Sequence, residues 1–193
     1  MLVILGESGS GKTTLIKALT ENGSKYKRVI TYTTRPPRDG EIDGIDYHFI
    51  AEPQFHKLDE KGFFAESMNY REWFYGISKE DCLEDHAAAV LTPHGLRTMK
   101  NLGIPTISIY LNVDRKTRLI KMLERGDSIE EAYRRNLTDV GEFDGISDEV
   151  DFVIYNPCFI LSPDNVLDIT KKILNPEKKT LDGQTCLFDG DEI

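Results

Sequence analysis

Cysteine is scarce in this sequence, and its three copies are not arranged to bind a metal or to form a disulfide framework. Cys82, Cys158 and Cys186 are widely spaced and include no Cys-x-x-Cys pair, which excludes the common zinc-site and disulfide-scaffold patterns. The four histidines are also dispersed, without metal-ligand spacing. Because disulfides are rare in the reducing cytosol, this cysteine usage favours a cytoplasmic location.

Long hydrophobic runs and an excess of positive charge are also absent. No apolar stretch approaches the roughly 20 residues of a membrane span, and the N-terminus lacks the basic leader of a signal peptide. The chain carries 24 Lys and Arg against 33 Asp and Glu, a net charge of −9, which argues against a broad nucleic-acid surface. We therefore expect no membrane and no nucleic-acid partner, and any phosphate ligand must be bound by locally concentrated cations.

The length and composition predict one soluble globular domain. The 193 residues, 39% hydrophobic and 30% charged, suffice for one well-cored domain and are too few for two. From residue 176 the sequence becomes lysine-rich and then acidic, and this segment is too short to form a core alone. We expect a domain over residues 1–175 and a mobile tail over 176–193, in which Leu187 and Phe188 could dock on another surface.

The opening stretch predicts a phosphate-binding loop. An apolar run over residues 1–5 leads into a glycine-rich turn with the spacing Gly, four residues, Gly-Lys-Thr. Glycines let backbone N–H groups surround anionic oxygens, the lysine reaches the outer phosphates and the first threonine can ligate phosphate-bound Mg²⁺. A glycine-serine turn without a ligand is the alternative, which the flanking strand and helix disfavour. The expected ATP-binding residues are Gly6, Ser8, Gly9, Ser10, Gly11, Lys12, Thr13 and Thr14, with Thr13 as the metal ligand.

A second basic segment follows a predicted strand over residues 28–32. Pro36 and Pro37 forbid helix and stiffen the loop that carries Arg35 and Arg38. The two arginines are three residues apart, one polyproline II turn, so both guanidinium groups can face the same side. Such a pair suits a phosphate because arginine makes bidentate, charge-assisted hydrogen bonds to it. A solvated basic turn is the alternative, and it is less favoured beside a phosphate loop.

The next segments, in order and spacing, resemble the GMP-binding region of the guanylate kinase family. The matching stretches are Thr-Thr-Arg-Pro-Pro-Arg-Asp-Gly-Glu at 33–41, Asp-Tyr-His-Phe at 46–49, Phe-Ala-Glu at 64–66 and Phe-Tyr-Gly at 74–76. Together with the phosphate loop and later segments, the resemblance covers about residues 1–175. The resemblance rests on several motifs in the same order and not on a single one, which makes it specific.

The resemblance implies roles for the residues that match. Arg35, Arg38, Tyr47 and Tyr75 would bind the acceptor phosphate, with Thr31 where the family often has serine. Glu66 matches the glutamate that reads guanine. The chemistry agrees, because a carboxylate accepts two hydrogen bonds and guanine offers the adjacent N1–H and N2–H donors that adenine lacks. A site built on such pairing can reject the wrong base strongly.

Three positions depart from the family pattern. Ile77 stands where a serine or threonine usually contacts the base, with Ser78 one place later. The family's Asp-x-Asp becomes Val90 and Thr92 when Gly95 is aligned. The first acid would lie near the metal, as a Walker-B aspartate does, and the second would help to read the guanine amino group. We keep Thr92 among the acceptor-binding residues.

The later segments resemble the family's lid and closing strand. The lid arginines would close over the transferring phosphate, and Arg125 matches one of them. Strict register places Asn136 at the second, whereas a one-residue gap brings Arg135 there; we favour Arg135, with Arg134 in reserve. An exposed helix face with Glu–Arg pairs is the alternative. Asn156 matches an asparagine near the adenine of ATP.

These observations predict an α/β protein with the P-loop NTPase fold. It should have a parallel sheet flanked by helices, a core over 1–32 and 77–175, a small mixed or antiparallel NMP-binding insertion over 33–76 and a helical lid at about 125–135. The resemblance implies an enzyme that uses ATP and Mg²⁺ to phosphorylate a nucleoside monophosphate, GMP or dGMP. Small nucleotides would be its ligands, and it would be a monomer or homodimer.

The mechanism expected from this family requires positioning and charge neutralisation and no general base, because the acceptor is already anionic. The catalytic groups would be Lys12, Arg38, Arg125 and Arg135. Two alternatives remain open. One is a related kinase that phosphorylates another acceptor, such as ribose 1,5-bisphosphate. Kinases of that kind resemble guanylate kinases and can also lack the aspartate pair. The other is a non-catalytic guanylate-kinase-like binding module.

Overall fold

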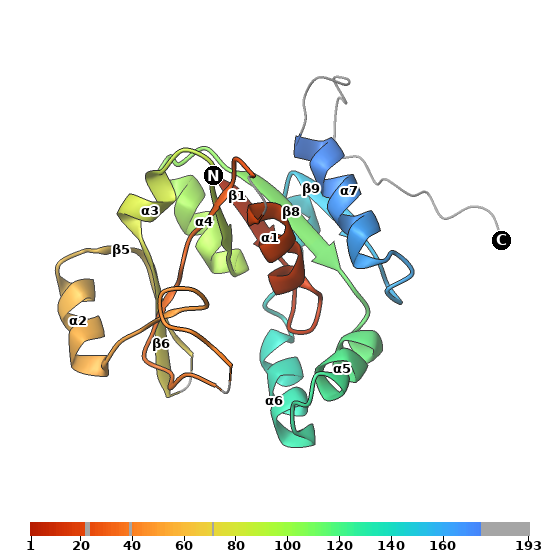
Figure 1. The fold of residues 1–193 in the computed structure, drawn as a ribbon, viewed down its shortest axis with the longest axis horizontal. Coiled ribbons are helices and arrows are strands. Elements are labelled where there is room, and N and C mark those ends of the chain that lie inside the picture. The colour runs from red at the N-terminus through yellow and green to blue at the C-terminus, as the bar shows by residue number, and fades with distance from the viewer. Residues whose placement is uncertain (22–23, 39, 71, 175–193) are drawn as a thin grey trace.

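A parallel sheet forms the centre of the molecule in a computed structural model that describes residues 1–21, 24–38, 40–70 and 72–174 (Figure 1). The tail expected at 176–193 lies outside the described residues. The strands stand in the order β2-β7-β1-β8-β9 and all neighbours are parallel. Their carboxyl ends therefore meet at one edge, where open α/β sheets bind ligands. The bounds are β1 Leu2–Leu5, β2 Lys27–Arg28, β7 Ala87–Val90, β8 Ile107–Asn112 and β9 Phe152–Tyr155.

The central strand β1 is buried along its whole length. Side chains alternate between the two faces of a strand, so Leu2 and Ile4 belong to one hydrophobic cluster and Val3 and Leu5 to the other. A strand covered on both faces is apolar throughout. This explains why a continuous hydrophobic run, and not an alternating one, encodes the first strand.

Helices cover both faces of the parallel sheet, as the sequence predicted. On one face α1 and α7 contribute to the cluster that contains Leu2 and Ile4. On the other face α4 contributes Leu96 and Met99, both fully buried. The bounds of the helices are α1 Lys12–Thr20, α2 Glu52–Glu60, α3 Lys79–Leu83, α4 Pro93–Asn101, α5 Arg115–Glu124, α6 Ile129–Asp139, the 3₁₀ turn η1 Ile146–Asp148 and α7 Pro163–Leu174.

A second, smaller sheet lies beyond the carboxyl edge of the first (Figure 1). Its order is β4-β3-β6-β5, with β3 and β4 parallel and β6 antiparallel to both β3 and β5. The mixed insertion expected from the sequence is therefore present. The strands are β3 Tyr32–Thr33, β4 His48–Phe49, β5 Phe64–Tyr70 and β6 Trp73–Ser78.

The single strand predicted over residues 28–32 is wrong, because the chain changes sheets within it. Val29 still donates a backbone hydrogen bond to Ala88 of the parallel sheet at 2.8 Å. Two residues later, Thr31 accepts a backbone hydrogen bond from His48 at 2.9 Å, beside the small sheet. A continuous β-branched run does not reveal which partner each residue pairs with.

The helices α5 and α6 form a pair that projects from the other side of the same edge (Figure 1). Both begin at polar N-caps: the side chain of Asp114 accepts from the Thr117 N–H, and that of Ser128 accepts from the Glu131 N–H. Such caps satisfy backbone donors that the first turn leaves unpaired. Across the described ranges, no helix is long and apolar enough to cross a membrane.

Candidate active site

The phosphate loop links β1 to α1, with the geometry that the glycine pattern predicts. Gly11 has a φ of 91° and is the N-cap of α1, a left-handed conformation that glycine adopts without strain. Gly9 has a φ of 83°, and a Cβ there would lie 2.7 Å from the carbonyl oxygen of Arg118 in α5. Glycine at this position therefore allows α5 to pack directly on the loop.

Two polar side chains of the loop have distinctive surroundings. The Lys12 Nζ donates a hydrogen bond to the carbonyl oxygen of Glu7 at 2.7 Å, and burial lowers the pKa of Lys12 to about 8, against the opposing charges of Asp139 and Glu7. The Ser10 hydroxyl is buried and has no hydrogen-bond partner among the residues that the structure describes. A buried, unpaired hydroxyl is uncommon in a folded protein.

A carboxylate from α6 lies against the phosphate loop, which sequence reasoning missed. Asp139 accepts a hydrogen bond from the Ser8 N–H at 2.7 Å. The buried Arg118 lies between two acids, 3.5 Å from Asp139 and 3.3 Å from Glu7. Arg118 and Asp139 are far from the loop in sequence and belong to no local motif, so only the packing of α5 and α6 on the loop reveals them.

A cavity of about 260 Å³ lies between the phosphate loop and the α5–α6 pair. Asn136, the residue at the position that strict register gives to the second lid arginine, is buried in its wall, and its Nδ2 has no partner in the described part of the chain. The lining residues are Glu7, Tyr110, Arg115, Arg118, Asn136, Asp139, Val140, Gly141, Phe143 and Asp144.

The two arginines of the loop after β3 are held by one glutamate. Glu41 accepts from the Arg35 guanidinium at 2.8 Å and from the Arg38 backbone N–H at 2.7 Å. Arg35 is 5% exposed, and its guanidinium lies 5.2 Å from the centre of the Tyr47 ring, a cation–π distance. Tyr75 is the neighbour of Tyr47, with ring centres 6.3 Å apart. The structure thus brings together four predicted phosphate-binding residues.

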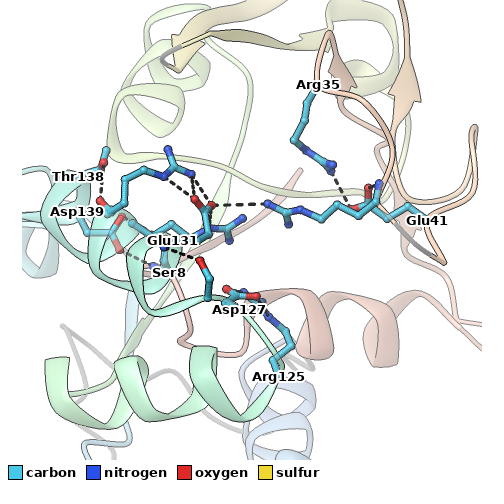
Figure 2. A network of polar contacts seen from close by, with 12 residues as sticks. Ser8, Arg35, Glu41, Arg125, Asp127, Glu131, Thr138 and Asp139 are labelled. Atoms are coloured by element: carbon cyan, nitrogen blue, oxygen red, sulfur yellow. Dashed lines mark hydrogen bonds and ion pairs between the residues drawn. The ribbon is translucent and has the colours of Figure 1, made fainter.

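Arginine side chains of α6 and of the loop after β3 meet at Glu131 of α6 (Figure 2). Arg134 forms an ion pair with Glu131, the Arg135 Nε donates to it at 2.8 Å, and Arg38 lies 3.8 Å from the same carboxylate. Burial opposes ionisation of Glu131, but the hydrogen bonds from Arg134 and Arg135 outweigh it and hold its pKa well below the usual range. The ion pair from Arg38 connects the small sheet's loop to the α5–α6 pair.

Arg125 is placed differently from the other predicted lid arginine. Its side chain is 54% exposed and pairs with Asp127 in the turn between α5 and α6 (Figure 2). Arg135, in contrast, is close enough to the phosphate loop for its charge to lower the pKa of Lys12. Arg135 therefore acts electrostatically on the phosphate loop, whereas Arg125 pairs with Asp127 and is half exposed.

The predicted base reader, Glu66, lies where β5 of the small sheet contacts the start of α4. We call Glu66, Ile77, Ser78, Thr92 and Gly95 the Glu66 set. Glu66 is 9% exposed, and burial raises its pKa to about 7, against the smaller effect of a hydrogen bond from Thr92. That bond, from the Thr92 hydroxyl to Oε1, measures 3.3 Å. A polar carboxyl is therefore held in a largely desolvated place.

The side chain of Asn156 stabilises the loop after β9 through two hydrogen bonds. Its side-chain Nδ2 donates to the carbonyl of Leu161 at 3.1 Å, and its Oδ1 accepts from the Leu161 N–H at 3.0 Å. The same loop presents Phe159, whose ring would lie 3.8 Å from a Cβ at Gly11. Asn156 therefore shapes a loop beside the phosphate loop, and its contact with adenine stays a prediction. Thr31 lies between the two sheets, and its role also stays a prediction.

Comparisons of the sequence and of the structure with known proteins all point to one family. The model of the family described as guanylate kinase matches residues 1–169. A guanylate kinase of Coxiella burnetii is 31% identical over 191 residues, which cover 91% of this chain and 93% of that protein. A guanylate kinase of Helicobacter pylori is 29% identical over 181 residues, which cover 91% of this chain and 88% of that protein. A crystal structure of guanylate kinase from Anaplasma phagocytophilum superposes with a TM-score of 0.64 at 20% identity, over 90% of this chain and 84% of that one.

Proposed function

The chain belongs to the guanylate kinase family, and on that premise we propose that it transfers the γ-phosphoryl group of ATP to a nucleoside monophosphate, with GMP and dGMP as acceptors. Residues 33–76 would bind the acceptor, and the helical segment around 125–135 would act as the lid. ATP would bind to the phosphate loop.

One observation carries this proposal: the Glu131 carboxylate connects an arginine of the acceptor loop to two arginines of the lid. Arg38 lies 3.8 Å from Glu131, which also binds Arg134 and Arg135. The charge of Arg135 in turn affects Lys12 in the phosphate loop. Cations from three separate segments thus surround one region, which is what transfer between two phosphates requires, since positioning and charge stabilisation dominate this reaction.

The residues of the phosphate loop fit a magnesium ion that arrives with the nucleotide. Within the described ranges, no group of three or more His, Cys, Asp or Glu side chains could hold a metal by itself. Mg²⁺ in nucleotide enzymes commonly takes substrate phosphates as ligands and needs few protein groups. The exposed Thr13 in the first turn of α1 would supply one ligand. When bound, the ion neutralises charge on the phosphates.

The side chains of this chain have separate tasks in the proposed reaction. Lys12 and the loop N–H groups bind the donor phosphates, and Arg35 with Arg38 binds the acceptor phosphate. Arg135 neutralises the transferred group when the lid closes. Closure also excludes water, which could otherwise accept the phosphoryl group. No proton needs to be removed from the acceptor, because a phosphate oxygen is already an anion.

A coupled assay for ADP formation tests the proposal. The acceptors are GMP, dGMP, AMP, UMP and ribose 1,5-bisphosphate, each with ATP and Mg²⁺, and Lys12→Met is the inactive control. We expect GMP and dGMP to give the highest kcat/KM. Turnover of AMP as fast as GMP would contradict the base assignment. Preference for the ribose bisphosphate, or nucleotide binding without any turnover, would favour one of the two alternative functions.

A further inference from the structure

Thr92 occupies a position with two structural roles. Its hydroxyl oxygen accepts a hydrogen bond from the Gly95 N–H at 3.1 Å, which caps α4. The same hydroxyl donates to Oε1 of Glu66 at 3.3 Å. A hydroxyl has only one proton to donate, so that proton is directed to Glu66. Thr92 therefore fixes the side chain of the predicted base reader.

Gly95 allows the Glu66 carboxylate to rest on the first turn of α4. A Cβ at this position would lie 2.2 Å from Oε2 and 2.8 Å from the Cδ of Glu66. No side chain larger than hydrogen fits there without displacing the carboxylate. The position of Glu66 is thus fixed from two directions, by the Thr92 hydroxyl and by the surface of α4.

The remaining residues of the Glu66 set have other roles. Ile77 is 2% exposed and belongs to the hydrophobic cluster around Val3 and Leu5. The Ser78 hydroxyl, 1% exposed, accepts from the Asp81 N–H and caps α3. Of the five residues in this set, only Glu66 carries a carboxylate. Glu142, in the loop after α6 and outside this set, also raises the pKa of Glu66 through its negative charge.

From this geometry we propose that Thr92 determines base specificity: it aims Glu66 at the N1–H of a 6-oxopurine but adds no second anionic acceptor for the guanine amino group. The chain would then phosphorylate hypoxanthine nucleotides as well as guanine nucleotides. This inference rests on the proposed function. Hypoxanthine keeps N1–H and lacks only the amino group, whereas adenine presents an acceptor at N1.

The expected discrimination follows from the number of hydrogen bonds. With Glu66 alone, the amino group forms one charge-assisted bond, whose loss corresponds to a factor of about 10 to 150. A second carboxylate at position 92 would receive the other N2–H and add a similar factor. The chain as it stands should therefore prefer GMP to IMP by about 10- to 150-fold.

The test measures kcat/KM for GMP, IMP and AMP with the full chain and three variants. Thr92→Asp adds a carboxylate and, like threonine, can cap α4. Thr92→Ser keeps the hydroxyl, and Glu142→Gln controls for a nearby negative charge outside the Glu66 set. We expect the GMP-to-IMP ratio to rise at least about tenfold in Thr92→Asp and to stay near the original value in Thr92→Ser and Glu142→Gln. A residue that only stabilised α4 would not change this ratio.

Two results would overturn the inference. One is a ratio above about 1,000 in the unmodified chain, measurable without any variant, because that exceeds what one charge-assisted bond supplies. The other is an unchanged ratio in a folded Thr92→Asp protein that turns over GMP. Both results require that the chain turns over GMP. They are therefore distinct from failure of the proposed function, which would appear as GMP that is neither phosphorylated nor bound in calorimetry. That failure would overturn both proposals.

Discussion

The carboxylate of Asp139 accepts a hydrogen bond from the backbone N–H of Ser8 at 2.7 Å, so the last residue of α6 rests on the phosphate loop. Asp139 also lies 3.5 Å from the buried Arg118. Backbone N–H groups of such loops bind anions. The protein's own carboxylate therefore uses one donor of the loop that would surround a triphosphate.

Replacement of this acid should favour nucleotide binding. We expect Asp139→Asn to bind ATP about tenfold more tightly, because it removes a negative charge close to the incoming phosphates; at effective protein dielectric constants, one charge a few ångströms away suffices for ~1.4 kcal/mol. Calorimetric titration with ATP in the absence of acceptor measures the effect. Asp144→Asn, in the wall of the same cavity, is the control, and unchanged or weaker binding by Asp139→Asn would contradict the prediction.

GMP binding should depend on pH through Glu66. Burial raises the pKa of this group to about 7, and only the ionised carboxylate accepts from both N1–H and N2–H. The affinity for GMP should therefore fall about tenfold from pH 8 to pH 6, as the ionised fraction falls from about nine tenths to about one tenth. Glu142 adds to the rise, and Cys82, whose own pKa is raised to about 12, stays neutral in this range.

The control for this pH profile is Glu66→Gln, which keeps the size of the side chain and removes the titration. Any pH dependence that remains in this variant belongs to the phosphate of GMP or to the arginines. An equally steep profile in both proteins would show that Glu66 does not titrate in the binding reaction.

Replacement of Arg38 should weaken recognition of the acceptor's phosphate, and replacement of Glu66 should weaken recognition of its base. Arg38→Ala should lower kcat/KM about 100-fold for GMP, dGMP and AMP alike, since a lost charge-assisted contact to phosphate carries no base information. Glu66→Ala should lower kcat/KM for GMP and leave that for AMP nearly unchanged. Acceptor panels measured with each variant separate these effects, and the same selectivity pattern in both would disprove the division into phosphate and base binding.

The two predicted lid arginines should differ in importance. The charge of Arg135 reaches Lys12, whereas Arg125 pairs with Asp127 and is half exposed. We expect Arg135→Ala to lower kcat by at least about 100-fold with a smaller effect on KM, the pattern of an interaction that forms in the transition state, and Arg125→Ala to have a smaller effect. Steady-state kinetics with saturating ATP give both parameters. A larger loss in Arg125→Ala, or a loss confined to KM in Arg135→Ala, would reverse the assignment.

The parts of the fold that could be read from sequence are those encoded by local patterns. The run from Leu2 to Leu5 and the glycines after it specify a buried strand and a loop, since burial on both faces and left-handed φ angles each select residue types locally. The family resemblance added the grouping of Arg35, Arg38, Tyr47 and Tyr75, and the structure brings these residues to one place.

Other features depend on contacts between segments that are distant in the chain. Asp139 is 131 residues from Ser8, and Arg118 is 110 residues from it. Nothing in the sequence near either residue indicates a contact with the phosphate loop. The split of residues 28–32 between two sheets has the same origin, because strand pairing is decided by the partners available and not by the strand's own residues.

The sequence by itself therefore determined that this chain has a phosphate loop, an arginine pair and a guanylate-kinase-like order of segments, because each is a short pattern with its own physical requirement. Only the tertiary structure decided that Glu131 joins the arginines of two segments, that Asp139 rests on the phosphate loop and that Thr92 and Gly95 hold Glu66 in place. These are distances between residues far apart in the chain, and they exist only once the helices have packed against the edge of the sheet.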